Sequence, residues 1–274
     1  MRPWLSTAAV VLTLVLHAAP AMAQEEKTPP YTEQKADLGY TLTSGNARAQ
    51  TLSARYDYTH AFVAGELTAY ASALRSETRD RVFTGVDASN NPIFLETDNV
   101  AAEAYGVGAK YRHDLGPRLF AYGLGAWARI LQAGLDDRWR GGGGLGVKLI
   151  APQPHKLDVE VGAEYTDERY IDGNTASFAS LRAFADYDFA FSDHSSFSSD
   201  LEFLENLDDT DDYRFNWNSS ITASMTNNLA LKLSYIVLFD NRPAVLVVSP
   251  GPPPVRDERE ELDQIFVTSL VVNW

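Results

Sequence analysis

The sequence predicts an all-β fold, an antiparallel up-and-down transmembrane β-barrel of about 12 strands in residues 36–274. The first observation is that Tyr213–Ser224 and Leu229–Asp240 alternate apolar and polar residues almost throughout. Side chains of a strand alternate between two faces, so each segment is a long strand with one apolar face. Soluble strands usually stop at about five or six residues, whereas tilted strands that cross a bilayer need about nine to eleven.

The second observation is an N-terminal export signal. Arg2 precedes an apolar run at residues 8–19, and Ala21-Met22-Ala23 forms a small-residue cleavage site before Gln24. This arrangement is typical of a cleaved secretory signal peptide, here residues 1–23. Residues 24–35 contain two adjacent prolines and mixed charges, and are predicted to be a flexible periplasmic leader.

The third observation is the length of the connections. Those after strands two, four, six, eight and ten are short, and the others are generally longer, as in barrels with periplasmic turns and extracellular loops. Residues 75–99 contain apolar pairs on both sides of a turn-like segment and could form a hairpin of their own. The predicted strands are residues 36–43, 49–60, 62–74, 100–112, 119–129, 138–150, 157–165, 176–191, 196–204, 213–224, 229–240 and 262–274.

Aromatic residues near the strand ends predict two interfacial girdles. On strand 119–129, Phe120, Tyr122 and Leu124 are assigned to the outer face. The final strand alternates up to the terminal aromatic Trp274, as expected of clients of the outer-membrane assembly machinery. The girdle residues are Tyr58, Tyr111, Phe120, Phe189 and Phe197 near the short turns, and Trp139, Tyr165, Tyr213, Phe215, Trp217 and Phe239 near the loops.

Composition excludes several functions. The net charge of −14 argues against binding nucleic acid, whose phosphates require a basic surface. The chain contains no cysteine, so disulfide and thiolate chemistry are absent. No cofactor is expected.

The polar faces of the predicted strands carry both signs of charge. Strands 138–150 and 157–165 would place a basic row beside an acidic one, and opposite charges on neighbouring strands attract. A fully paired interior would make a structural barrel, and a hydrated one a narrow pore. The predicted lumen-lining residues are Arg138, Arg140, Lys148, Asp158, Glu160, Glu164, Arg182, Asp186, Asp188, Asp200, Glu202, Arg214 and Lys232.

Other motifs have simpler explanations. Gly141-x-Gly143-x-x-Gly146 matches a dinucleotide fingerprint by letters, but it lies inside a strand with no helix after it. Glycines that let the sheet bend, or that let a bulky neighbour fill the lumen, explain it better. The proline-rich insertion at residues 244–255 could extend a strand, form a partial plug or contact a partner.

Two clusters of polar residues are weak metal candidates. The acidic loop could offer oxygen ligands to calcium, although its spacing differs from an EF-hand. The four histidines of the mature chain fall beside short turns on the predicted periplasmic rim, where they could titrate or bind metal. The residues are Asp208, Asp209, Asp211 and Asp212 for calcium, and the histidines His60, His113, His155 and His194.

Several stretches resemble the family of salt-induced outer-membrane proteins (YdiY-like), whose shared domain has no settled function. The chain departs from the family in the insertion at residues 244–255. The resemblance implies a barrel in the outer membrane and supplies no catalytic residues. It rests on Ser44-Gly45-Asn46, Gln50-Thr51-Leu52-Ser53, residues 183–192, Asp200-Leu201-Glu202, Asn206-Leu207-Asp208-Asp209, Asp211-Asp212-Tyr213-Arg214 and residues 228–235.

We therefore expect a non-enzymatic outer-membrane barrel of a Gram-negative bacterium that contacts outer-membrane lipid. Its expected role is envelope structure or passive permeation of ions and small solutes. One alternative is a substrate-selective channel, and another is an outer-leaflet hydrolase. The hydrolase would need histidine near the loops, where the sequence has none.

Overall fold

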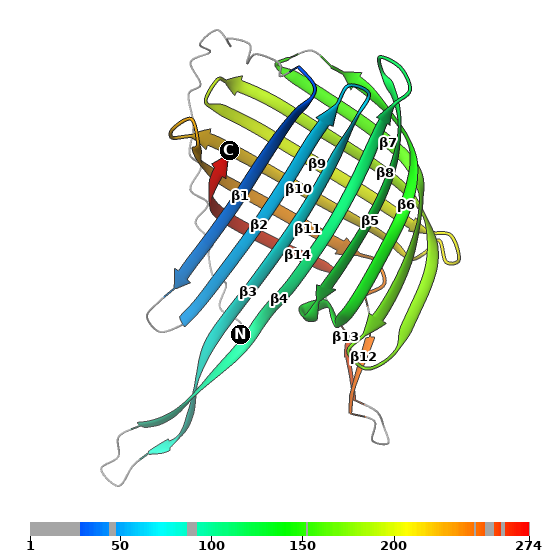
Figure 1. The fold of residues 1–274 in the computed structure, drawn as a ribbon. Coiled ribbons are helices and arrows are strands. Elements are labelled where there is room, and N and C mark those ends of the chain that lie inside the picture. The colour runs from blue at the N-terminus through cyan, green and yellow to red at the C-terminus, as the bar shows by residue number, and fades with distance from the viewer. Residues whose placement is uncertain are drawn as a thin grey trace, which may run out of the picture.

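The computed structural model describes residues 28–43, 48–86, 92–151, 153–243, 245–249, 255–258 and 261–273, so the predicted signal peptide lies outside the described residues. Twelve antiparallel strands form a closed barrel, as the sequence predicts, and two further strands form a separate hairpin (Figure 1). From β1 to β11 each strand pairs with the next one in sequence, β11 pairs with β14, and β14 pairs with β1 to close the ring. None of the described residues form a helix of the length and apolarity needed to cross a membrane.

The strands of the barrel are long. Several have 15 or more residues, which exceeds the roughly nine to eleven that a tilted strand needs to cross a bilayer. The strands are β1 (Tyr31–Thr43), β2 (Arg48–Phe62), β3 (Gly65–Val86), β4 (Pro92–Asp114), β5 (Leu119–Ile130), β6 (Leu135–Ile150), β7 (His155–Tyr170), β8 (Thr175–Ser192), β9 (Ser195–Asn206), β10 (Tyr213–Ser224), β11 (Leu229–Asp240), β12 (Val245–Ser249), β13 (Val255–Glu258) and β14 (Leu262–Asn273).

The clearest sequence patterns predict the strand limits best. β10 and β11 have the predicted bounds, because a turn rich in Asn and Thr separates two alternating segments. β1 begins at Tyr31, so the last five residues of the predicted leader are strand instead. They pair with the end of β2, which supplies hydrogen bonds that the sequence pattern alone does not reveal.

Two hairpins extend beyond the barrel at the same end (Figure 1). β3 and β4 stay paired as far as Val86 and Pro92, which confirms the hairpin predicted in residues 75–99. The insertion at residues 244–255 contributes β12, which pairs with β13.

The connections after β5 and β7 are shorter than predicted, because β6 begins at Leu135 and β7 continues to Tyr170.

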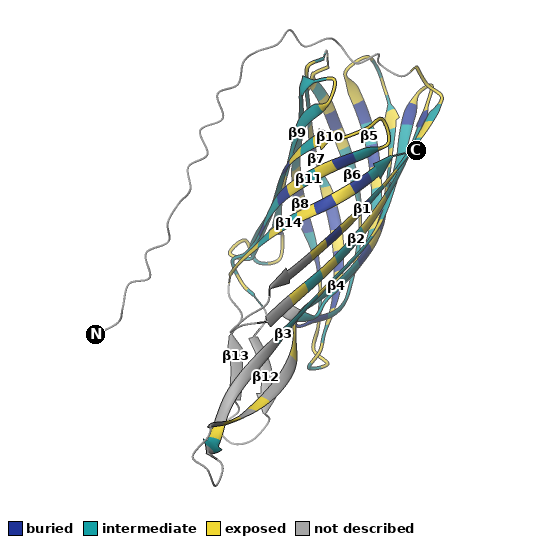
Figure 2. Cartoon of the chain, turned by 90° about the vertical axis from the view of Figure 1, so that its left-hand side faces the viewer, coloured by how far each residue is buried: buried dark blue, intermediate teal, exposed yellow. Residues whose placement is uncertain are grey.

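Buried and exposed residues alternate along the barrel strands (Figure 2). In β7, for example, Glu160, Glu164 and Glu168 are buried while Val161 and Tyr165 between them are exposed. The acidic side chains therefore point into the barrel and the apolar ones point outward. This arrangement is the reverse of a soluble protein and is typical of a membrane barrel.

The assignment of faces in β5 is wrong. Phe120 and Tyr122 were expected outside, yet they are only 0% and 6% exposed. Tyr122 is bonded across the interior by Arg182 of β8, so it points inward, and Leu124 follows on the same face. Phe120 is consequently not part of the aromatic girdle. Neither face of β5 between Phe120 and Ala128 carries a charge, so period-two patterning could not identify the inner one.

Glycines of β6 and β7 provide the room for these inward rings. A Cβ on Gly146 would lie 2.2 Å from Cζ of Phe120, and one on Gly162 would lie 2.5 Å from the Tyr122 hydroxyl. This confirms the interpretation of the glycine run as space for bulky neighbours. Phe120 and Tyr122 thus fill part of the lumen against a wall without side chains.

We expect Gly144→Ala to destabilise the barrel by about 1–3 kcal/mol, the usual cost of overpacking. Its Cβ would lie 2.2 Å from the backbone oxygen of Val161, which cannot move without shifting β7. Gly141→Ala in the same strand is the matched control, because a Cβ there meets nothing within 4 Å. Urea unfolding in lipid vesicles measures both variants, and equal midpoints would contradict the prediction.

Aromatic side chains cluster at both ends of the barrel wall. At the loop end, Phe215 stacks on Phe239 with ring centroids 4.9 Å apart. At the short-turn end, His155 stacks on Phe189 at 4.3 Å. Trp139 is 60% exposed on the outer face, as an interfacial anchor should be. Phe120 does not belong to the predicted girdle, and the positions of the other aromatic clusters are consistent with two girdles.

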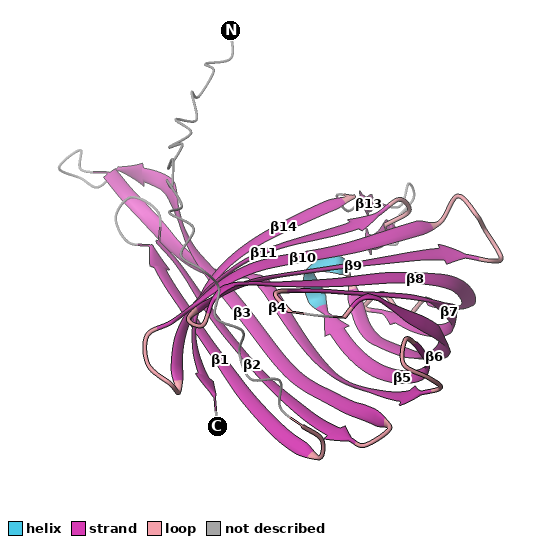
Figure 3. Cartoon of the chain, turned by 90° about the horizontal axis from the view of Figure 1, so that it is seen from above, coloured by secondary structure: helices cyan, strands magenta, loops and turns pink. Residues whose placement is uncertain are grey.

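The ring closes through a short seam. β1 and β14 share only five residue pairs, from Lys35↔Asn273 to Gly39↔Ser269. β1 and β2 share 13, from Tyr31↔Ala61 to Thr43↔Ala49. Figure 3 looks down on this ring of strands.

Candidate functional site

Charged side chains from strands that are not neighbours meet inside the barrel. Arg112 of β4 donates from Nη1 to Oδ2 of Asp158 of β7 at 3.0 Å. Lys110 of β4 likewise donates to Glu160 of β7. β5 and β6 separate β4 from β7, so these contacts must pass through the interior.

β6 and β7 set arginines against glutamates along their shared ladder. Nε of Arg138 donates to Oε1 of Glu168 at 2.7 Å, and these two residues are direct partners in the register. Nε of Arg140 donates to Oε1 of Glu164 at 2.5 Å. The predicted basic and acidic rows are therefore side by side and paired. Glu164 and Glu168 are almost fully buried, so neutralisation by arginine is essential to their burial.

Arg182 of β8 joins the two rows into one network. Its Nη1 donates to Oε2 of Glu160 at 2.9 Å and its Nε donates to Oε1 of Glu202 at 2.7 Å. Arg140 donates to the same Glu202 oxygen at 3.0 Å. We call Arg140, Glu160, Glu164, Arg182 and Glu202 the central cluster.

The central cluster is close to electrically balanced and well shielded. With Lys110 it contains three cations and three carboxylates. The side chains of Arg182 and Glu160 are only 5% and 3% exposed. Such a fully paired group is tolerated where unpaired charges would be expelled.

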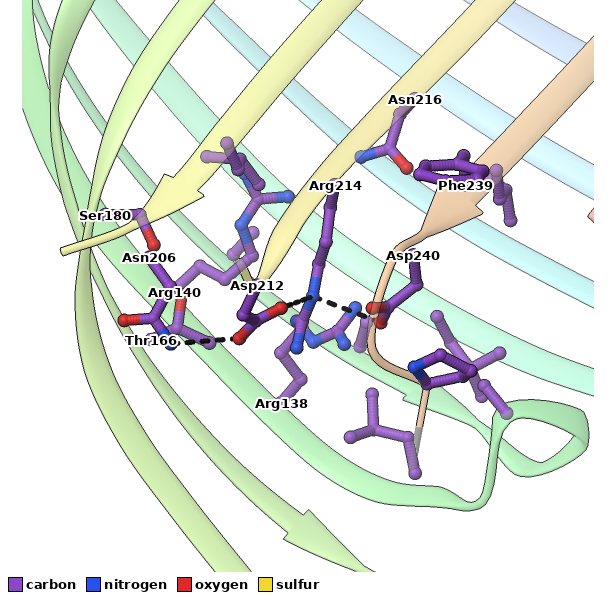
Figure 4. Close-up of a pocket in the computed structure, with 18 of the residues that line it drawn as sticks. Arg138, Arg140, Thr166, Ser180, Asn206, Asp212, Arg214, Asn216, Phe239 and Asp240 are labelled. Carbon is purple, nitrogen blue, oxygen red and sulfur yellow. Dashed lines mark hydrogen bonds and ion pairs between the residues drawn. The ribbon is translucent and has the colours of Figure 1, made fainter. Parts of the chain in front are cut away.

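A second group of charges surrounds Arg214 near the loop end (Figure 4). Nη1 of Arg214 donates to Oε1 of Glu168 at 2.6 Å, and its Nε lies 3.1 Å from Oδ2 of Asp240. Asp212 completes the group and accepts a bond of 2.9 Å from Asn206. These side chains come from β7, β9, β10, β11 and the loop between β9 and β10.

Two cavities lie in the described part of the lumen, and they share no lining residue. The loop-end cavity has a volume of about 360 Å³ and is lined by Arg138, Arg140 and Arg214 among others. The short-turn cavity is larger, about 1260 Å³, and includes Lys148 and Lys232 in its lining. Glu160, Arg182 and Glu202 line neither cavity. The central cluster therefore lies between them.

The other predicted lumen residues either bond a polar partner or lie opposite inward-pointing residues of the neighbouring strands. Lys148 bonds Asp114 at 2.8 Å, and Lys232 bonds Asp37 across the seam at 2.9 Å. Asp200 accepts a bond from Asn218, and Asp188 accepts one from Ser198. Asp186 lies directly opposite Asp200 and Asp158 in the register.

Sequence reasoning missed Glu168, Asp37 and the inward aromatics. Glu168 falls beyond the predicted end of its strand, although it continues the spacing of four set by Glu160 and Glu164. That spacing was an available signal, because every second residue of a strand shares a face. No local pattern could reveal that Asp37 meets Lys232, because 195 positions separate the two residues.

One inner wall is polar without charge. Along β10, the residues that alternate with outward Trp217 and Ile221 are all amides or hydroxyls. Most of this wall lines the short-turn cavity, and its loop-end residue Asn216 lines the other cavity. The wall adjoins the central cluster, because β10 pairs with β9 and Asn216 donates to Glu202 at 3.2 Å. The wall consists of Asn216, Asn218, Ser220, Thr222 and Ser224.

Three of the four carboxylates of the calcium candidate, those of Asp209, Asp211 and Asp212, already have cationic or amide partners. Arg242 pairs with Asp209 and lies 3.2 Å from Asp211, while Asp212 pairs with Arg214 and Asn206. Asp208 donates its backbone N–H to Asn206. Across the described ranges, His, Asp and Glu side chains form no group of three or more suited to holding a metal ion. Calcium binding stays an untested prediction.

The histidines lie at the short-turn end of the barrel, as their sequence positions indicate. His60 bonds the Thr32 hydroxyl at 2.8 Å and packs edge-on against Phe62. His155 bonds the Tyr187 hydroxyl at 2.7 Å. These two rings belong to outer aromatic clusters, whereas His194 lines the short-turn cavity, so the histidines do not converge. The structure therefore gives the idea of a histidine ring no geometric support.

Several solved structures with a similar arrangement of strands are described as porins or outer-membrane channels. The NanC porin is 11% identical, with a TM-score of 0.48 over 87% of this chain and 98% of that one. An outer-membrane channel from Pseudomonas putida F1 is 11% identical, with a TM-score of 0.46 over 89% and 96%. An anion-selective porin from Comamonas acidovorans is 10% identical, with a TM-score of 0.40 over 89% and 99%. No function is transferred at these values.

Comparison with curated proteins gave no match. A family model does match, over residues 36–245, which is most of the chain and nearly all of the barrel. The match agrees with the resemblance seen in the sequence. The chain therefore belongs to the family described as "Protein of unknown function, DUF481".

Proposed function

We propose that this protein is a non-enzymatic barrel in the outer membrane of a Gram-negative bacterium, exported by a cleaved signal peptide at residues 1–23. The outward faces support membrane insertion. Leu52, Leu145 and Val161 on three separate strands are 58%, 50% and 56% exposed. An apolar surface of this extent is unstable in water and stable against lipid. The C-terminal strand would carry the recognition signal for the assembly machinery.

Within that role, we infer a barrel that restricts permeation to small ions. The single observation that carries this inference is the central cluster, whose paired arginines and glutamates lie between two otherwise separate cavities. A solute that crosses the lumen must pass these side chains, and each except Glu164 has two charged partners. The predicted lumen-lining residues thus serve mainly to fill and neutralise the interior.

Single-channel recording on refolded protein tests this function. The native barrel is expected to show low conductance, and the double variant Arg182→Ser/Glu202→Ser is expected to raise it several-fold. The double variant removes one charge of each sign. Arg140 keeps Glu164 as a partner, and Glu160 keeps Lys110. The matched control is Arg169→Ser/Asp137→Ser, which removes an ion pair at the rim.

Two results would contradict the proposal. A native conductance as large as that of an open porin would show that the central cluster does not restrict passage. An unchanged conductance in Arg182→Ser/Glu202→Ser would show the same.

A substrate-selective channel is the second candidate, and the uncharged wall of β10 favours it. Five amide and hydroxyl side chains in a row can exchange hydrogen bonds with a neutral polar solute. The same recordings distinguish it, because a selective channel conducts ions that its solute then blocks. An outer-leaflet hydrolase is tested by a lipid-hydrolysis assay with calcium, in which we expect no product.

A further inference from the structure

The short-turn cavity is a large space that ends at the central cluster. Its volume of about 1260 Å³ exceeds the roughly 300–1,000 Å³ of pockets that take drug-sized ligands. Gln153, His194 and Asn227, from three short turns, belong to its lining, so the cavity extends to the turn end of the barrel. At its other end, the central cluster separates it from the loop-end cavity. The cavity therefore has the form of a cup that opens toward the turns.

One side of the cup carries hydroxyl groups. Ser196 and Ser198 of β9 and Ser220, Thr222 and Ser224 of β10 all belong to its lining. We call these five residues the hydroxyl face. In the register, Ser198 lies opposite Ser220 and Ser196 lies opposite Thr222, so the hydroxyls form a grid and not a single line. Same-face positions in such a grid are about 4.8 Å apart across the strands and about 6.7 Å apart along them.

Most of these hydroxyls are free to bind a solute. Ser198 donates to Asp188, and it is the only member of the hydroxyl face whose side chain bonds a described residue. Ser220 is only 6% exposed, has no partner in the described part of the chain and lines the cavity. A buried hydroxyl without a partner is unfavourable, and a ligand that bonds it removes that cost. A hydroxyl can donate one bond and accept others, so the best complement is a solute that does both.

The charged groups of the cup favour a neutral solute over an ion. Residues of both signs occur in the lining in nearly equal numbers. Lys148 is paired with Asp114 at 2.8 Å, and Lys232 is paired with Asp37 at 2.9 Å. An ion gains from these groups only by breaking such pairs, whereas a neutral solute leaves them intact. An apolar solute is also unsuitable, because it would cover the hydroxyl face without bonding it.

A sugar complements the hydroxyl face better than a peptide does. Extended peptides are commonly bound at a free strand edge, where unpaired backbone groups hold them. Both edges of β10 are already paired, with β9 from Tyr213↔Glu205 to Ala223↔Ser195 and with β11. The face therefore offers only side chains, arranged in two dimensions. A sugar carries hydroxyls around a ring, so it can bond several points of the grid at once.

We propose that the short-turn cavity binds a neutral oligosaccharide, which lies against the hydroxyl face and is stopped by the central cluster. The solute enters from the periplasm, toward which outer-membrane barrels usually direct their short turns. The volume of the cup accommodates several linked sugars. The proposal rests on the proposed function, because the central cluster that restricts permeation also ends the cup. It adds a binding site for a solute that does not cross the barrel.

Isothermal titration calorimetry on the refolded barrel tests the site, in a detergent whose head group is not a sugar. The probes are maltotriose, cellotriose and isomaltotriose, which are neutral glucose trimers that differ only in linkage. N-acetyl-triglycine amide is the peptide comparison. We expect at least one trimer to bind at millimolar concentrations and the peptide not to bind.

Two variants with the same chemical changes locate the binding. Ser220→Ala/Thr222→Val removes two hydroxyls from the face with little change in shape. We expect it to weaken binding of the trimer about tenfold, because two hydrogen bonds are lost. Ser219→Ala/Thr268→Val is the matched control and should bind normally, because both residues lie on the outer face, opposite Tyr235 and Leu233 in the register.

A second variant keeps the test decisive if the first does not refold. Ser196→Ala/Ser224→Ala removes two other hydroxyls of the face and should also weaken binding. Swelling of vesicles that contain the native barrel then shows whether the trimer crosses. We expect no swelling, because the central cluster stops the sugar.

The outcomes separate the two proposals. Absence of binding for all three trimers, or equal binding by the native barrel and the hydroxyl-face variants, would overturn the oligosaccharide site. So would binding of N-acetyl-triglycine amide as tight as that of the trimers. None of these results changes the conductance, which decides the small-ion function. Binding together with swelling would instead overturn that function and the closed end of the cup, and would leave the hydroxyl face as the site.

Discussion

Arg182→Met is expected to lower the free energy of unfolding by about 3 kcal/mol, because it removes one partner of a buried ion network. The guanidinium contacts Glu160, Glu202 and the Tyr122 hydroxyl. Without it, both carboxylates remain buried with fewer cationic partners. The loss should appear as a lower urea midpoint in lipid vesicles.

Arg169→Met is the matched control for this prediction. Its guanidinium is also paired with carboxylates, Asp136 and Asp137, but the side chain is 56% exposed at the rim. Exposed pairs contribute about 0–1 kcal/mol. Adding Glu202→Gln to Arg182→Met should recover part of the stability, since it removes a carboxylate that lost one of its two cationic partners. If Arg182→Met and Arg169→Met lower the free energy of unfolding equally, burial of the central cluster contributes nothing to the stability of the barrel.

Phe120→Ala is expected to cost about 3–5 kcal/mol, as large-to-small substitutions of buried aromatic residues usually do. The ring is fully buried, and it lies over the bare surface of Gly146 with the Arg112 guanidinium 5.1 Å from its centre. Removing it leaves a void with glycine on one side. Equilibrium unfolding of the refolded barrel measures the loss.

A double-mutant cycle with Gly146→Leu checks the cause. Gly146→Leu alone should be destabilising, because its Cβ would overlap the Phe120 ring. Combined with Phe120→Ala, the new leucine has room and should restore part of the stability. Additive losses in the double variant would show that the two residues do not share one space.

Sequence periodicity predicted the fold and much of the charged interior. It succeeded where the two faces of a strand differ chemically, as in β7, where glutamates alternate with Val161 and Tyr165. It failed for β5, because both of its faces are uncharged from Phe120 to Ala128. Periodicity shows that two faces exist, and only a chemical difference identifies the inner one.

The partners across the barrel could not be predicted in the same way. Pairs such as Arg138 and Glu168 follow from neighbouring strands once the register is known. The contacts of Arg182 with Tyr122 and of Lys232 with Asp37 depend on the curvature of the whole ring, which no local pattern encodes. The same is true of the short seam between β1 and β14.

The short pairing of β1 with β14 also has a consequence for assembly. It joins Lys35 to Asn273, so the final contact connects the two sequence ends of the barrel. Such long-range closure is slow, because the chain between must be ordered first. In an N-terminal fragment that lacks β14, β1 pairs with β2 alone, so one of its edges has no partner and the sheet stays open. Hairpins can accumulate in sequence order, but a finished cylinder exists only after the last strand arrives.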